Sequence, residues 1–171
     1  SRGENGSGAY ASTGAEAAVA CAAGTLNGNG TGDCTNPAAG KCASADGTTC
    51  RGTGTGATQE ANCPVNTFNV GSQVMGTCTS VGAGKRAVDG SGNYDNSGAV
   101  NEAPCPAGTY NTDGTGDCQD IPNGKRGEDG SGAYVATGAI AAVNCADGSY
   151  STNGTGNCVD VPAGQRGETS G

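Results

Sequence analysis

Large apolar side chains are sparse in this chain, and they recur at one place relative to the cysteines. Such a residue lies five positions after a cysteine four times along the chain: Leu26, Phe68, Tyr110 and Tyr150. We expect this side chain to cover a disulfide and to form the small core of one unit. An exposed aromatic ladder that binds a ligand is the alternative. The pattern therefore predicts several small units instead of one large core.

The spacing of the cysteines divides the chain into four repeats. Three are 40 residues long and one is 44, with boundaries at 1–40 for repeat 1, 41–84 for repeat 2, 85–124 for repeat 3 and 125–164 for repeat 4. Repetition at a fixed period is typical of an array in which each unit contacts mainly its neighbours. Residues 165–171 restart the pattern, so we expect them to begin a fifth repeat and to act as a tail between subunits.

The second half of each repeat is predicted to be a β-hairpin closed by a disulfide. In repeat 3 a short run ends at Thr109 and Tyr110, and a polar segment then leads to Cys118. Asp113–Gly114 lies in that segment and is a type I′ turn signal, because both central residues of such a turn need positive φ. Asn153–Gly154 has the same place in repeat 4.

The first half of each repeat carries a segment of small residues, at 14–20 in repeat 1 and at 138–144 in repeat 4. We expect an extended or loosely coiled strip that lets another backbone approach closely, and a short helix is the alternative. Arg-Gly-Glu occurs at 2–4, 126–128 and 166–168. It is interpreted as a turn with a local charge pair.

Two places in the first half change together between repeats. They hold an arginine and a tyrosine in three repeats, and both become cysteine in repeat 2, as Cys42 and Cys50. We expect the two places to touch, through a disulfide in repeat 2 and through Arg–Tyr stacking elsewhere. The stacking pairs are Arg2 with Tyr10, Arg86 with Tyr94 and Arg126 with Tyr134. Pairing of Cys42 and Cys50 with other cysteines is the alternative.

Composition explains why covalent cross-links are needed. Only 15 of the 171 residues are Leu, Ile, Val or Phe, whereas 34 are Gly, and such a chain buries too little apolar surface to offset its loss of conformational entropy. The ten cysteines include no CxxC pair, and the chain has no His, which disfavours zinc. The predicted disulfides are Cys21–Cys34, Cys42–Cys50, Cys63–Cys78, Cys105–Cys118 and Cys145–Cys158. Free buried thiols are the alternative.

These features predict an all-β or irregular fold. We expect small disulfide-rich modules with little hydrophobic core, arranged as a linear tandem array. Disulfides persist in oxidising compartments, so the chain is expected to be extracellular or on a cell surface.

The segment Cys105-Pro-Ala-Gly-Thr-Tyr110, followed by Gly116 and Cys118, resembles the cysteine-rich repeats of ephrin-receptor-like and tumour-necrosis-factor-receptor-like ectodomains. Similar runs occur in surface proteins of ciliates and algae, such as immobilisation antigens. The likeness covers about half of each repeat, and it implies an elongated extracellular module. Those repeats continue with a second cysteine where this chain has Ile121 and, in the next repeat, Val161.

Several function classes are disfavoured. The net charge of −8 argues against nucleic acid, whose binding needs clustered Lys and Arg. No apolar run is long enough to span a bilayer, so membrane insertion is not expected. No nucleophile with a base is recognisable, so we do not expect an enzyme.

Two kinds of ligand or modification are suggested. Asp89, Ser91, Asn93 and Asp95 place oxygen atoms at alternating positions, as calcium loops do, although such strings are also typical of turns. Calcium is the one cofactor that the sequence suggests. Asn5, Asn29 and Asn153 begin Asn-X-Ser/Thr glycosylation sequons, and a bare Asn turn is the alternative.

The leading hypothesis for function is a structural subunit of an extracellular filament. Its partners would be further copies of the same chain, stacked head to tail as a helical homopolymer, and attached glycans. The alternative is a fragment of a cell-surface adhesin or receptor stalk, which binds an external partner.

Overall fold

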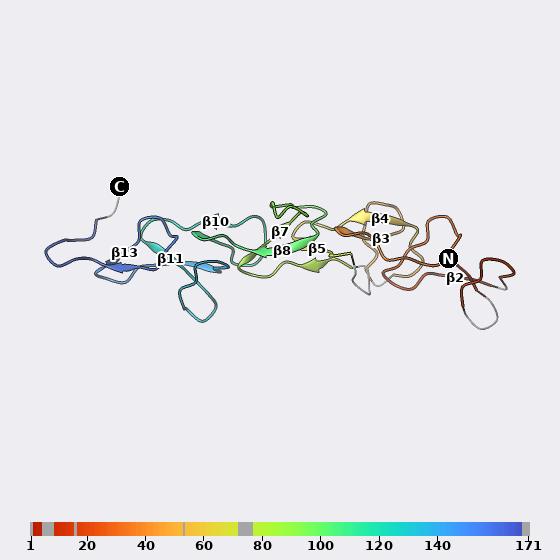
Figure 1. Cartoon of the computed structure of the whole chain (residues 1–171), viewed down its shortest axis with the longest axis horizontal. Helices are drawn as coiled ribbons and strands as arrows, with labels where there is room; N and C mark the ends of the chain where they lie inside the picture. Colours follow the sequence, from red (N-terminus) through yellow and green to blue (C-terminus); the bar gives the residue numbers. More distant parts are fainter. Residues whose placement is uncertain (1, 5–8, 16, 53, 72–76, 169–171) are drawn as a thin grey trace. The chain divides into compact units, whose positions relative to one another are not determined.

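The computed structural model describes residues 2–4, 9–15, 17–52, 54–71 and 77–168, and of Arg2 only the backbone. Within these ranges there is no helix, and the chain forms short strands (Figure 1). The strands are β1 (Arg2–Glu4), β2 (Ala17–Val19), β3 (Lys41–Ser44), β4 (Gln59–Asn62), β5 (Thr67–Phe68), β6 (Thr79–Ser80), β7 (Lys85–Val88), β8 (Asn101–Pro104), β9 (Thr109–Tyr110), β10 (Gln119–Asp120), β11 (Lys125–Glu128), β12 (Ala141–Asn144), β13 (Ser149–Tyr150) and β14 (Val159–Asp160).

The strands form seven two-stranded sheets, each made of strands that follow one another in the chain: β1–β2, β3–β4, β5–β6, β7–β8, β9–β10, β11–β12 and β13–β14. A repeat therefore contains a front hairpin in its first half and a back hairpin in its second half. In repeat 1 the back hairpin is reduced to a single antiparallel bridge between Leu26 and Thr35. The small disulfide-rich all-β fold expected from the sequence is the one observed.

The chain divides into two compact units. One contains Ser1–Ser80 and Val88–Asn101, and the other contains Val81–Ala87 and Glu102–Gly171. The boundaries between the units fall near the end of repeat 2 and inside repeat 3, so the sequence repeat and the compact unit do not coincide.

The front hairpin corrects the interpretation of Arg-Gly-Glu as a turn. In repeat 4 these residues belong to β11, which pairs antiparallel with the small-residue segment β12, with Gly127 opposite Ala142. Arg126 and Glu128 are two positions apart and so lie on one face of the strand, where Arg126 Nη2 contacts Glu128 Oε1 at 2.7 Å. The charge pair is present, but extended backbone carries it. The small-residue segment is extended, as expected.

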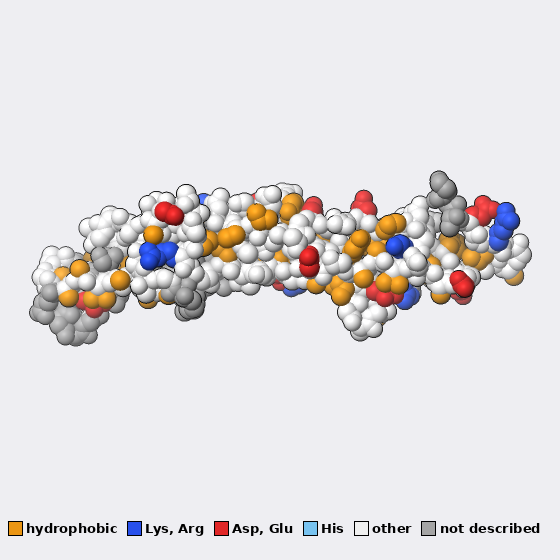
Figure 2. Space-filling model, turned by 180° about the vertical axis from the view of Figure 1, so that it is seen from behind, with side chains coloured by type: hydrophobic (Ala, Val, Ile, Leu, Met, Phe, Trp, Pro, Cys, Tyr) orange, Lys and Arg blue, Asp and Glu red, His pale blue; other side chains and the backbone are white. Residues whose placement is uncertain are grey.

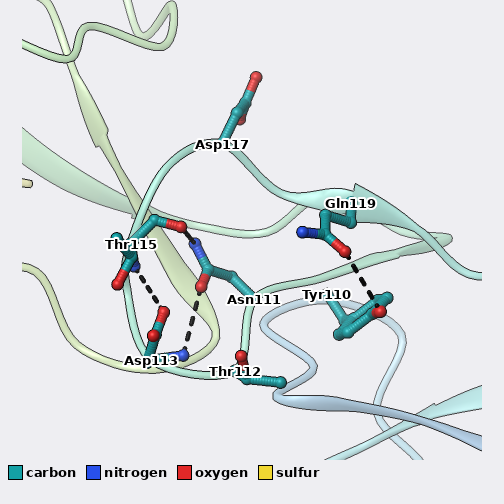
Figure 3. A pocket seen from close by; sticks show the side chains of 7 residues that line it. All are labelled: Tyr110, Asn111, Thr112, Asp113, Thr115, Asp117 and Gln119. Atoms are coloured by element: carbon teal, nitrogen blue, oxygen red, sulfur yellow. Dashed lines mark hydrogen bonds between the residues drawn. The ribbon is translucent and has the colours of Figure 1, made fainter.

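The back hairpin is not closed by a type I′ turn. In repeat 3, Gly114 has a φ of 81°, but among the described non-glycine residues only Asn66 has positive φ, so Asp113 does not meet the requirement of that turn. Eight residues separate β9 from β10, and the Asn111 side chain organises them (Figure 3). Asn111 Oδ1 accepts the N–H groups of Asp113 and Gly114 at 3.3 and 2.9 Å.

The amide nitrogen of the Asn111 side chain holds the remainder of the loop. Asn111 Nδ2 donates to the carbonyls of Thr115 and Gly116 at 3.4 and 3.2 Å. Equivalent side chains bond to backbone in the other repeats: Asn27 to Gly30 and Gly32, Asn69 to Gly71 and Lys41, and Ser151 to Gly154. The three asparagines are buried. A buried amide needs such partners, because an unpaired one loses its hydrogen bonds to water.

The buried interior consists mainly of small side chains and sulfur. Cys21, Cys42, Cys63 and Cys105 are buried, together with alanines that include Ala43, Ala57, Ala61, Ala87, Ala99 and Ala139. Of the four larger residues expected to form small cores, only Phe68 is buried, and Tyr150 is 41% exposed. One face of the molecule shows hydrophobic side chains in small separate groups among backbone and other side chains (Figure 2).

Replacing Asn111 by Ala is expected to lower the free energy of unfolding by about 1–3 kcal/mol, because the buried loop N–H and C=O groups lose their partners. Asn111→Asp keeps the acceptor but places a carboxylate oxygen against the carbonyls of Thr115 and Gly116, so this variant should also lose stability. Denaturant unfolding of the oxidised protein, followed by circular dichroism, measures both. The exposed neighbour Thr112→Ala is the control, and an equal effect of that variant would contradict the role of Asn111.

Candidate functional site

Five disulfides cross-link the chain: Cys21–Cys34, Cys42–Cys50, Cys63–Cys78, Cys105–Cys118 and Cys145–Cys158. These are the pairs that the cysteine spacing suggests. Since they use all ten cysteines, the chain has no free thiol. In the three regular repeats the bridge joins the start of the back hairpin to the end of its loop, and its partners are 13 positions apart in the sequence.

A backbone contact recurs between the back half of one repeat and the front half of the next. In it, a glycine N–H of the later repeat donates to the carbonyl of the cysteine that begins the back half of the earlier repeat. The carbonyl of the alanine that follows this glycine accepts the N–H of the residue directly after Leu26, Phe68 or Tyr110 in the earlier repeat. The donor–acceptor pairs are Gly56 to Cys21 and Asn27 to Ala57, Gly98 to Cys63 and Asn69 to Ala99, and Gly138 to Cys105 and Asn111 to Ala139, at 2.8–3.2 Å. The first four bonds lie in one compact unit and the last two in the other. We call this arrangement the repeat contact.

Small residues are required at the repeat contact. Ala57, Ala99 and Ala139 are at most 1% exposed. Gly40 has a φ of +74°, and a Cβ there would lie 2.1 Å from the carbonyl oxygen of Gly98. A Cβ at Gly84, which has the same φ, would lie 2.3 Å from the carbonyl oxygen of Gly138. Both the positive φ and the lack of room for a Cβ therefore favour glycine as the last residue of a repeat. Without a side chain at that position, the backbone two repeats further along the chain can pack closely against it.

The loop of a back hairpin also packs on the end of the preceding repeat. A Cβ at Gly154 would lie 2.5 Å from the Ile121 carbonyl oxygen, and one at Gly114 would lie 2.2 Å from that of Val81. Ile121 and Val81 are 4% and 5% exposed. Ile121 and Val81 thus provide buried apolar side chains where successive repeats meet.

The repeat contact has two open halves within the described part of the chain. Ala15, the counterpart of the buried alanines, is exposed. At the other end, the Cys145 carbonyl and the Ser151 N–H correspond to groups that are bonded in the inner repeats, and no described residue pairs with them. Gly124 and Gly164 keep φ values of +77° and +82°, but no atom lies within 4 Å of a Cβ placed at either.

Arginine and tyrosine of the front hairpin reach the back half of their own repeat. Arg86 Nη1 donates to Asp117 Oδ1 at 3.0 Å, and Arg126 Nη1 donates to Asn157 Oδ1 at 3.0 Å. The Tyr134 hydroxyl donates to the Thr155 carbonyl at 3.2 Å. Each tyrosine forms a backbone β-bridge with the residue two positions after the arginine, as Tyr134 does with Glu128. Arg–Tyr stacking stays a prediction, and the Arg2 side chain lies outside the described residues.

One arginine atom lacks a partner for a reason that is visible in the sequence. Arg126 Nε donates to Glu128 Oε1 at 2.9 Å, whereas Arg86 Nε is buried without a hydrogen-bond partner. Repeat 3 has Val88 where repeat 4 has Glu128. Val88 has no carboxylate to accept a hydrogen bond from Arg86, whose guanidinium instead donates to Asp117 through Nη1.

The proposed calcium ligands serve their own loop. Asp89 Oδ1 accepts the N–H groups of Ser91 and Asn93 at 2.8 and 2.9 Å, and Asp95 Oδ1 accepts that of Ser97 at 3.0 Å. Among the described residues, the one group of three Cys, Asp, Glu or His side chains close enough to share a metal consists of disulfide cysteines. The loop is built as an Asx turn, in which carboxylates accept N–H groups.

Such hydrogen bonds lower the pKa of several exposed aspartates. In Asp129, the Ser131 hydroxyl contributes most and the N–H groups of Ser131 and Ala133 follow, and these bonds hold the pKa of the carboxyl below its usual value of 3.8. The N–H groups of Thr48 and Thr49 and the Ser44 hydroxyl hold the pKa of Asp46 well below that value. Hydrogen bonds from Asn93 lower the pKa of Asp89, and hydrogen bonds from Thr115 lower the pKa of Asp113.

Acid should therefore weaken these loops. Since the pKa is lower in the folded than in the unfolded state, the stabilisation is complete above about pH 4 and is lost as the pH falls through the folded pKa. The urea midpoint of the oxidised protein is expected to fall between about pH 4 and pH 2, and to fall less in Asp129→Asn. Asp147→Asn, which removes an exposed charge elsewhere, is the control. An identical acid response in all three proteins would contradict the role of Asp129.

Two hollows lie over the back-hairpin loops. One has a volume of about 230 Å³ and is lined by Tyr110, Asn111, Thr112, Asp113, Thr115, Asp117 and Gln119 (Figure 3). Its polar groups already bond to one another, as the Tyr110 hydroxyl does to Gln119 at 3.3 Å. The other, of about 320 Å³, has the equivalent place in repeat 1. Neither hollow combines a nucleophile with a base.

Two of the three sequons lie on described surface. Asn29 and Asn153 are exposed. Asn153 Oδ1 accepts the Thr155 hydroxyl and N–H, at 2.7 and 3.2 Å, and Asn29 Oδ1 accepts the Thr31 N–H at 3.0 Å. Asn5 lies outside the described residues.

A search of family models and of curated proteins found no match to this sequence. In the described part of the chain, no helix has the length and apolar character needed to cross a bilayer.

Sequence reasoning found part of the repeat contact, because it expected another backbone to approach closely at the small-residue segment 138–144, where Gly138 and Ala139 lie. It did not identify Gly98 and Ala99 in repeat 3, and it passed over the organising Asn111 beside the stronger turn signal Asp113–Gly114. Their recurrence at one place in successive repeats was the signal that could have found them.

Proposed function

We infer that the protein is a structural subunit of an extracellular filament, in which copies of the chain stack head to tail. The observation that carries this proposal is the pair of open halves of the repeat contact. The end that holds Cys145, Ser151 and Gly164 offers one half, and the end that holds Ala15 offers the other. A contact between different surfaces of identical molecules propagates into an open fibre unless its rotation closes a ring.

The chemistry of the repeat contact supports its use between molecules. Its hydrogen bonds join main-chain groups, so any repeat that presents the same backbone provides the same partners. In a stack, Gly124 and Gly164 of one copy would face Gly14 and Gly56 of the next, as Gly40 faces Gly98 within the chain. Tyr150, which is 41% exposed, would be covered as Phe68 is.

The segment after Gly164 supports the same arrangement. Arg166 Nη2 and Glu168 Oε1 form an ion pair at 3.0 Å, as Arg126 and Glu128 do on β11. Residues 165–168 thus repeat the sequence of a front-hairpin strand, and they would pair with a sheet edge of the next copy by strand addition. The remainder of the tail expected from the sequence, 169–171, lies outside the described residues.

Gly124→Ala tests this stacking. A Cβ at residue 124 meets no atom in the single chain, but in a stack it would clash with a carbonyl oxygen as it would at Gly40 and Gly84. The variant should fold and fail to form fibres. Gly92→Ala is the matched control, because Gly92 has a similar φ of +84° and equally open surroundings, so its backbone strain is comparable.

Negative-stain microscopy and sedimentation of both variants and of the unmodified chain give the readout. Long uniform fibres from the unmodified chain and from Gly92→Ala, with none from Gly124→Ala, are expected. A chain that stays monomeric at every concentration, or fibres from Gly124→Ala equal to those of the control, would overturn the filament. Short particles that cluster on membranes would favour the adhesin or stalk.

An oxidising, extracellular location is part of this proposal, and it is supported by the five disulfides. The exposed sequons make glycosylation a further part. In protein from its native source, we expect Asn29 and Asn153 to carry N-linked glycans, which enzymatic release and peptide mass spectrometry would detect. Unmodified asparagine at both positions in secreted protein would remove glycans from the proposal.

A further inference from the structure

Repeat 2 brings two disulfides into contact with each other. Cys42–Cys50 and Cys63–Cys78 lie in the same compact unit, and Cys50 Sγ is 4.0 Å from Cys78 Sγ. The sulfur atoms of Cys42, Cys50 and Cys78 all lie within 4.8 Å of one another. In the described part of the chain no other repeat has a second disulfide, so this contact distinguishes repeat 2.

The four sulfur-bearing residues differ in their exposure. Cys42 and Cys63 are 1% and 0% exposed, whereas Cys50 and Cys78 are half-buried. Each disulfide therefore has one buried and one accessible partner, and the two accessible partners face each other. An external thiolate can attack only a sulfur that it reaches, so Cys50 and Cys78 are the points of entry.

We propose that repeat 2 is a thiol–disulfide exchange site, which a dithiol reductant converts into a form linked by Cys50–Cys78. One thiolate of the dithiol attacks Cys78 Sγ, and the bond to Cys63 breaks, leaving Cys63 as a thiol after it takes a proton. The second thiol of the dithiol then displaces Cys78 as a thiolate, and the reductant leaves as its own disulfide. Two electrons and one proton have passed to the protein at this stage, and the second proton is taken up when Cys42 leaves in the next step.

The exchange step follows inside repeat 2. The Cys78 thiolate attacks Cys50 Sγ, the Cys50–Cys78 bond forms, and the Cys42–Cys50 bond breaks. Cys42 leaves and takes up the second proton. If the reductant enters at Cys50 instead, the Cys50 thiolate attacks Cys78 Sγ and releases Cys63. Both routes give one product, with a Cys50–Cys78 bridge and thiols at Cys42 and Cys63.

The burial pattern favours this product over simple reduction of either bridge. Both thiols then lie in buried positions, where burial disfavours the thiolate and makes reversal slow. The Cys42 sulfur also has the Ala61 carbonyl as an acceptor at 3.5 Å. The new bridge spans 28 residues, compared with 8 and 15 for the bridges it replaces, and a longer closed loop restricts the unfolded chain more.

Limited reduction of the full chain under native conditions tests the exchange. The folded protein is treated with substoichiometric dithiothreitol, free thiols are trapped with N-ethylmaleimide, and non-reduced peptides are mapped by mass spectrometry. We expect label on Cys42 and Cys63 together with a Cys50–Cys78 cross-linked peptide as the main two-electron product of repeat 2. Cys105–Cys118 is the internal control, because reduction there should label both of its own cysteines.

Label on Cys42 and Cys50 with Cys63–Cys78 intact, or the converse, would overturn the exchange. So would loss of both bridges without any Cys50–Cys78 species. A Cys42→Ser/Cys50→Ser variant keeps the second bridge and removes the exchange partner, and its reduction should label Cys63 and Cys78 equally. These readouts do not depend on whether the chain forms filaments.

Discussion

Covalent cross-linking of short hairpins is the constraint on which the remaining structure depends. With 34 glycines and few large apolar residues, the chain buries too little apolar surface to order its loops by burial alone. The four disulfides in the second halves of the repeats each fix a back hairpin, and the same hairpin presents the backbone groups of the repeat contact. Removing the bridge would therefore free both the hairpin and the surface on which the next repeat packs.

Buried asparagines provide the second level of order. Asn27, Asn69 and Asn111 each bond through the side chain to the backbone of their own repeat. The backbone N–H of each also donates to the following repeat. One residue thus shapes a loop and joins two repeats. This dual use explains why a polar side chain occupies a buried position in a chain with so few apolar alternatives.

Prediction from the sequence succeeded where periodicity carried the information. The cysteine pairs and the hairpins in the second half of each repeat follow from spacing, because equivalent residues recur at 40-residue intervals. Local turn rules failed at Asp113–Gly114, since Asn111 imposes a longer loop that no dipeptide signal describes. The strand β11 was missed because Gly127 and two charged residues lack β propensity; it forms because Gly127 lets Ala139 pack closely, at 2.8 Å from a Cβ placed there.

The repeat contact is made of main-chain hydrogen bonds at positions with small side chains or none. Its dependence on backbone constrains only a few positions as such a sequence changes over evolution. A duplicated or deleted repeat finds the same donors and acceptors on both of its neighbours. Outward-facing residues take no part in these bonds and are free to diverge. The number of repeats can therefore grow or shrink one at a time, while glycine and alanine at the contact are the positions that selection must keep.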